Sequence, residues 1–172
     1  MELFEAPDNR AIIYTGEERA QLESWLTSYR ETLLIKCNGL DVEQMKIRPV
    51  KTSDLSLLGL IRHMTWVEQV WFELTFIGAD VPKYYKQPDD NDADFHNLDE
   101  IGLDEVLTNY DRAIAKSIEC AFEQDLSTVS KKEWRHIYVD LRWIYLHMLE
   151  EYARHCGHAD IIRELIDGVT GQ

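Results

Sequence analysis

The stretch HMLEEYARHCGHADIIRELIDG, residues 147–168, decides the fold of this chain. Successive residues of an α-helix lie about 100° apart around the axis, because one turn takes about 3.6 residues. On that spacing, one arc of the surface collects the apolar side chains Leu141, Ile144, Met148, Tyr152, Ala159, Ile162 and Ile166. The pattern predicts a long amphipathic helix that begins near Val139 and is stopped by Gly168.

Two polar residues interrupt the apolar stripe of this helix. His155 lies near the centre of the stripe, and Glu151 lies on its edge one turn earlier, roughly 6 Å along the axis. A carboxylate that faces a core must be paired, protonated or bound to a metal, because burying an unpaired charge is costly. The two side chains can therefore converge on one ion, with at least one more ligand from elsewhere. The alternative interpretation is a Glu–His hydrogen bond at a helix contact.

The composition indicates one soluble domain, residues 1–172, without a nucleic-acid or membrane partner. The chain has 172 residues, 45% of them hydrophobic, which is enough for a core. Its net charge of −14 repels phosphate backbones and anionic membrane surfaces. No apolar run approaches the ~20 residues of a membrane span, and the acidic N-terminus does not resemble a signal peptide. Three cysteines without a C-x-x-C pattern fit a reducing cytoplasm, so we expect a cytoplasmic protein.

Apolar stripes of helical period predict four principal helices near residues 16–38, 54–77, 100–123 and 134–167. Thr15 and Glu18 have the spacing of a capping box at the first of them, and Ser53 or Asp54 precedes the second. A short helical turn is expected after Asp41. No stretch alternates with period two, so the predicted fold is all-α: a four-helix bundle with one long crossover connection.

The crossover, near residues 79–98, is acidic and contains two prolines. Asp90, Asp92 and Asp94 alternate, but the glycine and the closing glutamate of an EF-hand loop are missing, so calcium binding is not predicted. His96 is expected to be a surface residue.

A third ligand for the candidate site is available on the second helix. His63 lies at the edge of its stripe, a position where a lone histidine is more often a hydrogen-bonded core residue. Sites in helix bundles are built from facing helices, and His63, Glu151 and His155 would leave one coordination position open, as in catalytic zinc sites. Ni²⁺ and Fe²⁺ also accept this ligand set. The H-E-x-x-H motif of zincins and the paired E-x-x-H motifs of di-iron bundles are absent.

Four motifs together resemble a known family: GEERAQL at 16–22, SLLGLIRHM at 56–64, VEQVWF at 67–72 and, above all, the stretch at 147–168. With these motifs the chain resembles the DinB-like metalloenzyme superfamily, which includes mycothiol-dependent maleylpyruvate isomerase. Within it, the chain looks closest to an actinobacterial-type branch of unknown function. One departure is Lys51-Thr52, where Pro-Ser is expected ahead of the second helix.

The resemblance implies that His63, Glu151 and His155 bind one divalent metal, zinc in the first place and nickel or iron as alternatives. Many members carry histidine where this chain has Glu151, which instead matches the isomerase-like pattern. The implied protein is a cytoplasmic homodimer whose open metal position takes a low-molecular-weight thiol. The thiolate would attack a small electrophile, giving S-transfer or thiol-assisted isomerisation.

Other polar residues are candidates for supporting roles. His147 and His158, just off the apolar face, could orient the ligands or transfer protons, or simply make hydrogen bonds at the core boundary. Arg142 and Arg163 could bind carboxylates of the thiol or substrate, although arginines at helix edges are usually solvated. Cys156 follows a ligand, so it points away from the metal and is expected to be packed.

Two other functions stay open on the sequence alone. One is a non-enzymatic metal- or ligand-binding bundle, which a closed set of four ligands would support. The other is a metal-dependent hydrolase with water as the nucleophile.

Overall fold

The structure is a computed structural model that describes residues 2–171. Its elements are α1 (Glu18–Ile35), α2 (Val42–Met45), α3 (Leu57–Glu68), η1 (Gln69–Phe76), α4 (Leu103–Ala121) and α5 (Leu141–Asp167). Within the described range, extended pairing is limited to isolated bridges, so the all-α prediction is confirmed. The short turn expected after Asp41 is α2, where Asp41 and Gln44 form a reciprocal capping box.

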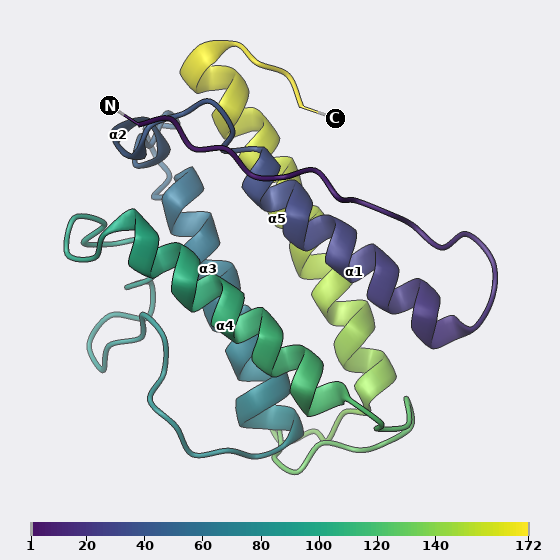
Figure 1. Ribbon diagram of the computed structural model, residues 1–172. Coiled ribbons are helices and arrows are strands. Elements are labelled where there is room, and N and C mark those ends of the chain that lie inside the picture. The colour runs from purple at the N-terminus through teal and green to yellow at the C-terminus, as the bar shows by residue number, and fades with distance from the viewer. Residues whose placement is uncertain (1, 172) are drawn as a thin grey trace.

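The long helices lie side by side (Figure 1). α5 packs against α1 and α3, and α4 packs against α3 and its continuation η1. The apolar stripe of α5 supplies core side chains such as Met148 and Tyr152, which are fully buried. None of the helices in residues 2–171 is both long and apolar enough to cross a membrane.

The last helix begins at Leu141, two residues after the start near Val139 that its apolar stripe predicted, so the earlier boundary at position 134 is wrong. Trp134 and Ile137 exchange backbone hydrogen bonds of 2.8 and 3.0 Å in a tight turn. The two residues between them, Arg135 and His136, have φ angles of 49° and 69°, a left-handed conformation that no α-helix contains. α5 begins only after Asp140, whose carboxylate accepts a 2.8 Å hydrogen bond from the backbone N–H of Trp143.

The expected caps of the first two long helices are also wrong. The capping box of Thr15 and Glu18 does not form, because Glu17 is the N-cap residue of α1 and its side chain makes no cap bond. α3 begins after Ser56 rather than after Ser53 or Asp54, and the Ser56 hydroxyl accepts a 3.1 Å hydrogen bond from the N–H of Gly59. These differences move the predicted helix starts by only a few residues, and they leave the buried apolar face of each helix unchanged.

A buried polar network joins the four long helices at the point where α3 widens into the π-helix η1. The guanidinium of Arg30 from α1 donates two hydrogen bonds, of 2.7 and 2.8 Å, to the fully buried carboxylate of Glu68. Tyr152 from α5 donates to the same carboxylate at 2.8 Å, and its hydroxyl lies 3.0 Å from that of Tyr110 on α4. The network fixes the relative positions of the helices around the core.

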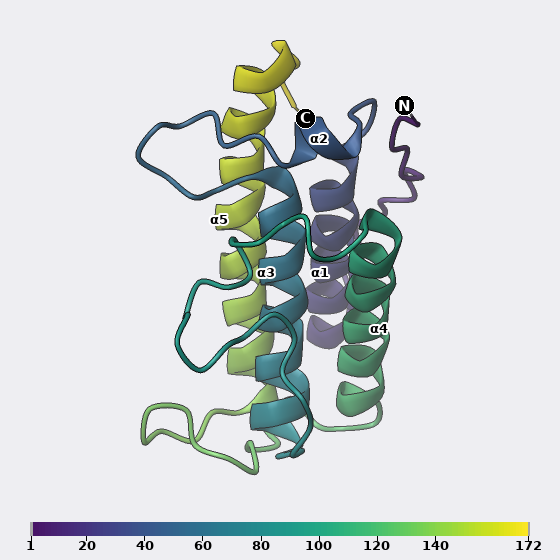
Figure 2. The ribbon, with the colours of Figure 1, turned by 90° about the vertical axis from the view of Figure 1, so that its left-hand side faces the viewer.

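The crossover between η1 and α4, residues 77–102, passes over α3 (Figure 2). Arg62, which is 4% exposed, donates to the backbone carbonyls of Ala93 at 2.8 Å and of His96 at 3.0 Å. The ring of Phe95 covers Gly59, where a Cβ would lie 2.7 Å from that ring. The crossover is therefore tied to the part of α3 that carries His63.

Candidate metal centre

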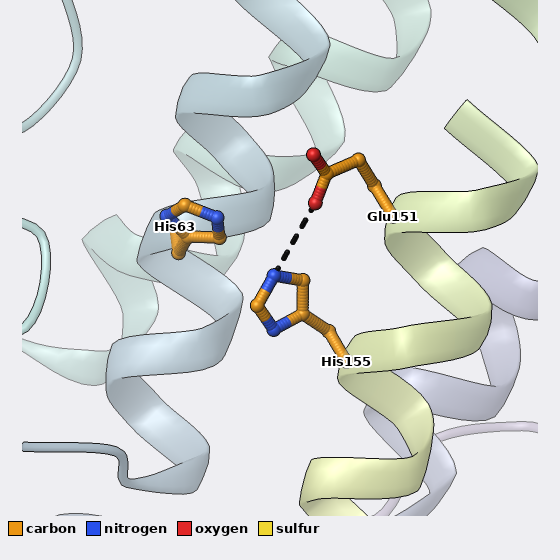
Figure 3. Close-up of side chains that lie close together, drawn as sticks. All are labelled: His63, Glu151 and His155. Atoms are coloured by element: carbon orange, nitrogen blue, oxygen red, sulfur yellow. Dashed lines mark ion pairs between the residues drawn. The ribbon is translucent and has the colours of Figure 1, made fainter. Parts of the chain in front are cut away.

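His63 on α3 and Glu151 and His155 on α5 converge between the two helices (Figure 3). One ligand atom of each residue can be chosen so that all three lie within 4.8 Å of one another. His155 Nε2 is 3.4 Å from Glu151 Oε2, and the ring centroids of His63 and His155 are 4.7 Å apart. The helical spacing of Glu151 and His155 places both on the face of α5 that meets α3.

The three side chains are mostly buried but remain reachable. Their exposed fractions are 21% for His63, 17% for Glu151 and 10% for His155. Contact with His155 lowers the pKa of Glu151 below its ordinary value; burial opposes this shift, and His147 and His63 add to it. The carboxylate of Glu151 is thus available as an anionic ligand beside two imidazoles.

The donor set, and the distance between His155 and Glu151, fit a divalent metal ion. A charge-assisted hydrogen bond between imidazole and carboxylate normally measures about 2.7–2.9 Å, so the 3.4 Å between His155 and Glu151 is long for such a bond. Two donors that each lie about 2.0–2.1 Å from one tetrahedral zinc ion are about 3.3–3.4 Å apart. Two imidazoles and one carboxylate are also the ligands of catalytic zinc sites with an open position.

Asp94 of the crossover lies directly behind His63. Its Oδ2 is 2.6 Å from Nδ1 of His63, and its Oδ1 accepts a 3.0 Å hydrogen bond from Lys86. Burial acts to raise the pKa of Asp94, but the bonds to His63 and Lys86 outweigh it and lower that pKa below its ordinary value. The bond to Asp94 occupies Nδ1, which leaves Nε2 of His63 as the nitrogen available to a ligand.

The one sequence signal at Asp94 is its place in the alternation of Asp90, Asp92 and Asp94. No fixed spacing relates a residue in a loop to a helix, so its partnership with His63 could not be derived.

His147 lies next to the second oxygen of Glu151. Its Nε2 is 3.4 Å from Glu151 Oε1 and its Nδ1 is 3.2 Å from Glu150. The ring is stacked on Trp143 with centroids 4.9 Å apart, and it meets Trp71 edge-on at 4.6 Å. The two indoles hold this imidazole in place beside the carboxylate.

His158 lies behind His155, with the two Nδ1 atoms 3.3 Å apart. Burial lowers the pKa of His158, and His155 and Arg154 act in the same direction. His158 thus offers a hydrogen-bond partner to the ring nitrogen of His155 that does not face Glu151.

The two arginines considered for carboxylate binding are engaged elsewhere. Arg142 forms a 2.8 Å ion pair with Glu18 at the start of α1. Arg163 donates to the backbone carbonyl of Lys36 at 2.9 Å and to Asp167 at 3.0 Å. Arg142 thus joins α5 to the start of α1. Arg163 joins α5 to the residue after α1 and to the last turn of α5 itself.

The cysteines of the chain are poor nucleophiles. All three are free and buried: Cys37, Cys120 and Cys156. Burial raises the pKa of Cys37 to about 12, and it does the same for Cys156. Since the thiolate is the reactive form, a thiol reaction at this centre needs a thiol from outside the chain.

A family model described as Mycothiol-S-transferase matches residues 21–168. The matched range runs from α1 to the residue after α5, and it contains His63, Glu151 and His155. Among curated proteins, none matches the chain.

Proposed function

The chain belongs to the mycothiol-S-transferase family, a family of the DinB-like superfamily, and from this premise we propose that it joins a mycothiol-like low-molecular-weight thiol to small electrophiles. His63, Glu151 and His155 would hold one divalent cation at the reacting thiol. The observation that carries the proposal is the convergence of these three side chains from two helices within 4.8 Å. It is supported by a family whose name describes transfer of a thiol.

A divalent cation held by His63, Glu151 and His155 would stabilise a thiolate at neutral pH, because coordination deprotonates a thiol. The residues of the chain supply the rest. His63 and His155 are neutral donors, and the charge of Glu151 offsets part of the charge of the cation. The partial exposure of His63 and Glu151 leaves a side from which the thiol and the electrophile can approach.

In the reaction we propose, the thiolate sulfur forms a bond to an electrophilic carbon of the substrate. The proton of the thiol leaves to solvent or to His147, whose Nε2 lies beside Glu151 Oε1. If the carbon carries a leaving group, that group departs with the electron pair of its bond and the product is a thioether. If the carbon belongs instead to a double bond conjugated with a carbonyl group, its π pair moves toward the carbonyl oxygen as sulfur adds. Rotation about the resulting single bond, return of that pair and departure of the thiolate with the pair of the C–S bond then give an isomerisation.

Zinc is the metal we propose first, because the three ligands and their spacing suit it. Nickel and iron are the alternatives, since imidazole and carboxylate also accept them. We assign His147 and His158 to the orientation of Glu151 and His155, their immediate neighbours.

We also propose a cytoplasmic homodimer. The aromatic face of the VEQVWF motif is one place where a subunit contact could be expected, but Trp71 and Phe72 are only 3% and 1% exposed within the core of the chain and cannot form one. Trp143 and Leu146, which are 41% and 53% exposed on α5, are available instead. Sedimentation that shows only a species of single-chain mass would exclude the dimer.

The test of the function is a thiol reaction with monochlorobimane, an electrophile whose thioether products fluoresce. Mycothiol and N-acetylcysteine are supplied in turn to zinc-loaded and metal-free protein. We expect the zinc-loaded wild type to accelerate thioether formation, and His155→Ala to lose that acceleration. His96→Ala, which changes a histidine of the crossover, is the matched control and should behave as wild type. Equal rates with and without protein for every thiol would refute the proposal, and turnover of ester substrates without thiol would favour a hydrolase.

A further inference from the structure

We propose that Asp94 is a positioning residue, which holds the proton of His63 on Nδ1 and thereby presents the Nε2 lone pair to a cation. The inference rests on the metal site proposed above. It adds to the candidate metal centre a residue that does not itself contact the ion, and it assigns a function to the acidic crossover.

The first step is the tautomer of His63. A neutral imidazole carries its proton on one of its two nitrogens. The hydrogen-bond partners of the ring decide which nitrogen carries it, because a nitrogen that faces an acceptor must be the one that donates. Asp94 Oδ2 is 2.6 Å from Nδ1 of His63, and an ionised carboxylate can only accept a hydrogen bond. The proton is therefore on Nδ1, and Nε2 has a free lone pair.

The second step is that the carboxylate of Asp94 is buried and that each of its oxygens has a partner. Asp94 is 0% exposed, and a buried carboxylate is costly unless each oxygen has a partner. Oδ2 faces His63 and Oδ1 accepts from Lys86 at 3.0 Å. The ammonium group of Lys86 also donates to the carbonyl of Asn91 at 2.5 Å, within the same crossover.

The third step is that the crossover cannot easily move away from His63. Arg62, the preceding residue on α3, donates to the carbonyls of Ala93 and His96, one on each side of Asp94. Phe95 is stacked on the ring of His63 with centroids 5.1 Å apart. The backbone carbonyls of Ala93 and His96 and the ring of Phe95 therefore hold the crossover against α3 and the imidazole, and the orientation of His63 is coupled to the docking of the crossover.

The first test measures zinc affinity by competition with a chromophoric chelator. Removal of the hydrogen-bond partner behind a metal-ligating histidine typically weakens metal binding about 10–100-fold, and we expect that loss for Asp94→Asn. Asp92→Asn is the matched control, because it makes the same change of charge at an exposed position of the same crossover and should bind like wild type. Equal affinities of the two variants would overturn the proposal.

The second test measures the tautomer of His63 directly, by ¹⁵N NMR of metal-free protein at mildly alkaline pH. We expect the wild type to carry the proton on Nδ1, and Asp94→Asn to shift the ring toward the Nε2–H form. A merely structural role of Asp94 would leave the tautomer unchanged, and a wild-type ring protonated on Nε2 would overturn the inference even if the variant fails to fold.

The two proposals fail separately. The tautomer is measured without metal. Wild-type protein that binds no zinc but carries the His63 proton on Nδ1 would therefore refute the metal site and still support the role of Asp94 in setting the tautomer. Wild-type protein that binds zinc with His63 in the other tautomer before binding would sink only the role of Asp94.

Discussion

Replacement of Arg30 by methionine should be among the most destabilising single changes in this chain. Its guanidinium makes two hydrogen bonds, of 2.7 and 2.8 Å, to Glu68, which is 0% exposed. Arg30→Met keeps an apolar stem of similar length but leaves the carboxylate with Tyr152 as its remaining donor at 2.8 Å. Removal of one partner of a buried ion pair costs about 3–5 kcal/mol, because the other charge stays buried.

The double variant Arg30→Met, Glu68→Met separates this penalty from the net worth of the pair. Apolar residues often replace a buried ion pair without loss of stability, and Tyr152 would keep its contact with Tyr110, 3.0 Å away. We expect the free energy of unfolding of the double variant to lie within about 1–2 kcal/mol of the wild-type value. This loss is much smaller than the sum of the losses in Arg30→Met and Glu68→Met measured singly. Urea unfolding followed by far-UV circular dichroism measures all the free energies. A loss below about 1 kcal/mol for Arg30→Met, or strict additivity in the double variant, would refute the reasoning.

Three further predictions concern the caps, the crossover and the thiols. Gly59→Ala should lower the free energy of unfolding by about 1–2 kcal/mol, because the added Cβ would lie 2.7 Å from Phe95 and must push the crossover outward. Asp140→Ala should cost about 1 kcal/mol in the same urea assay, since the N-cap bond to Trp143 at the start of α5 is lost; no change would mean that the cap does not stabilise the helix. Ellman's reagent should react slowly with the native protein and should titrate three thiols only after denaturation, and rapid native reaction would contradict their burial.

The sequence was most informative where the helical period determines which face of a helix a side chain lies on. The stripe of α5 predicted the buried positions of Met148 and Tyr152, and it placed Glu151 and His155 at the contact with another helix. It was least informative about Glu68, whose buried carboxylate was not predicted although the residue lies four positions after Met64 and seven after Ile61, within the apolar arc of α3. That helix is buried on several sides, because it packs against both α4 and α5, so a single stripe does not describe its buried surface.

The remaining differences arise where the chain leaves regular helices. The left-handed pair at Arg135 and His136 contains neither glycine nor asparagine, the residues that usually mark such a turn, and the predicted boundary at position 134 is therefore too early. The contact of Asp94 with His63 joins residues 31 positions apart across an irregular crossover, and no periodicity connects them.

The central claim is that His63, Glu151 and His155 bind one divalent cation, and zinc titration by calorimetry tests it most directly. Wild type should bind one equivalent of zinc and should melt at a higher temperature when loaded, because binding to the native state adds stability by mass action. His155→Ala should bind far more weakly, while His96→Ala should match wild type. Equal affinity of the two variants, or no binding by wild type, would contradict the account.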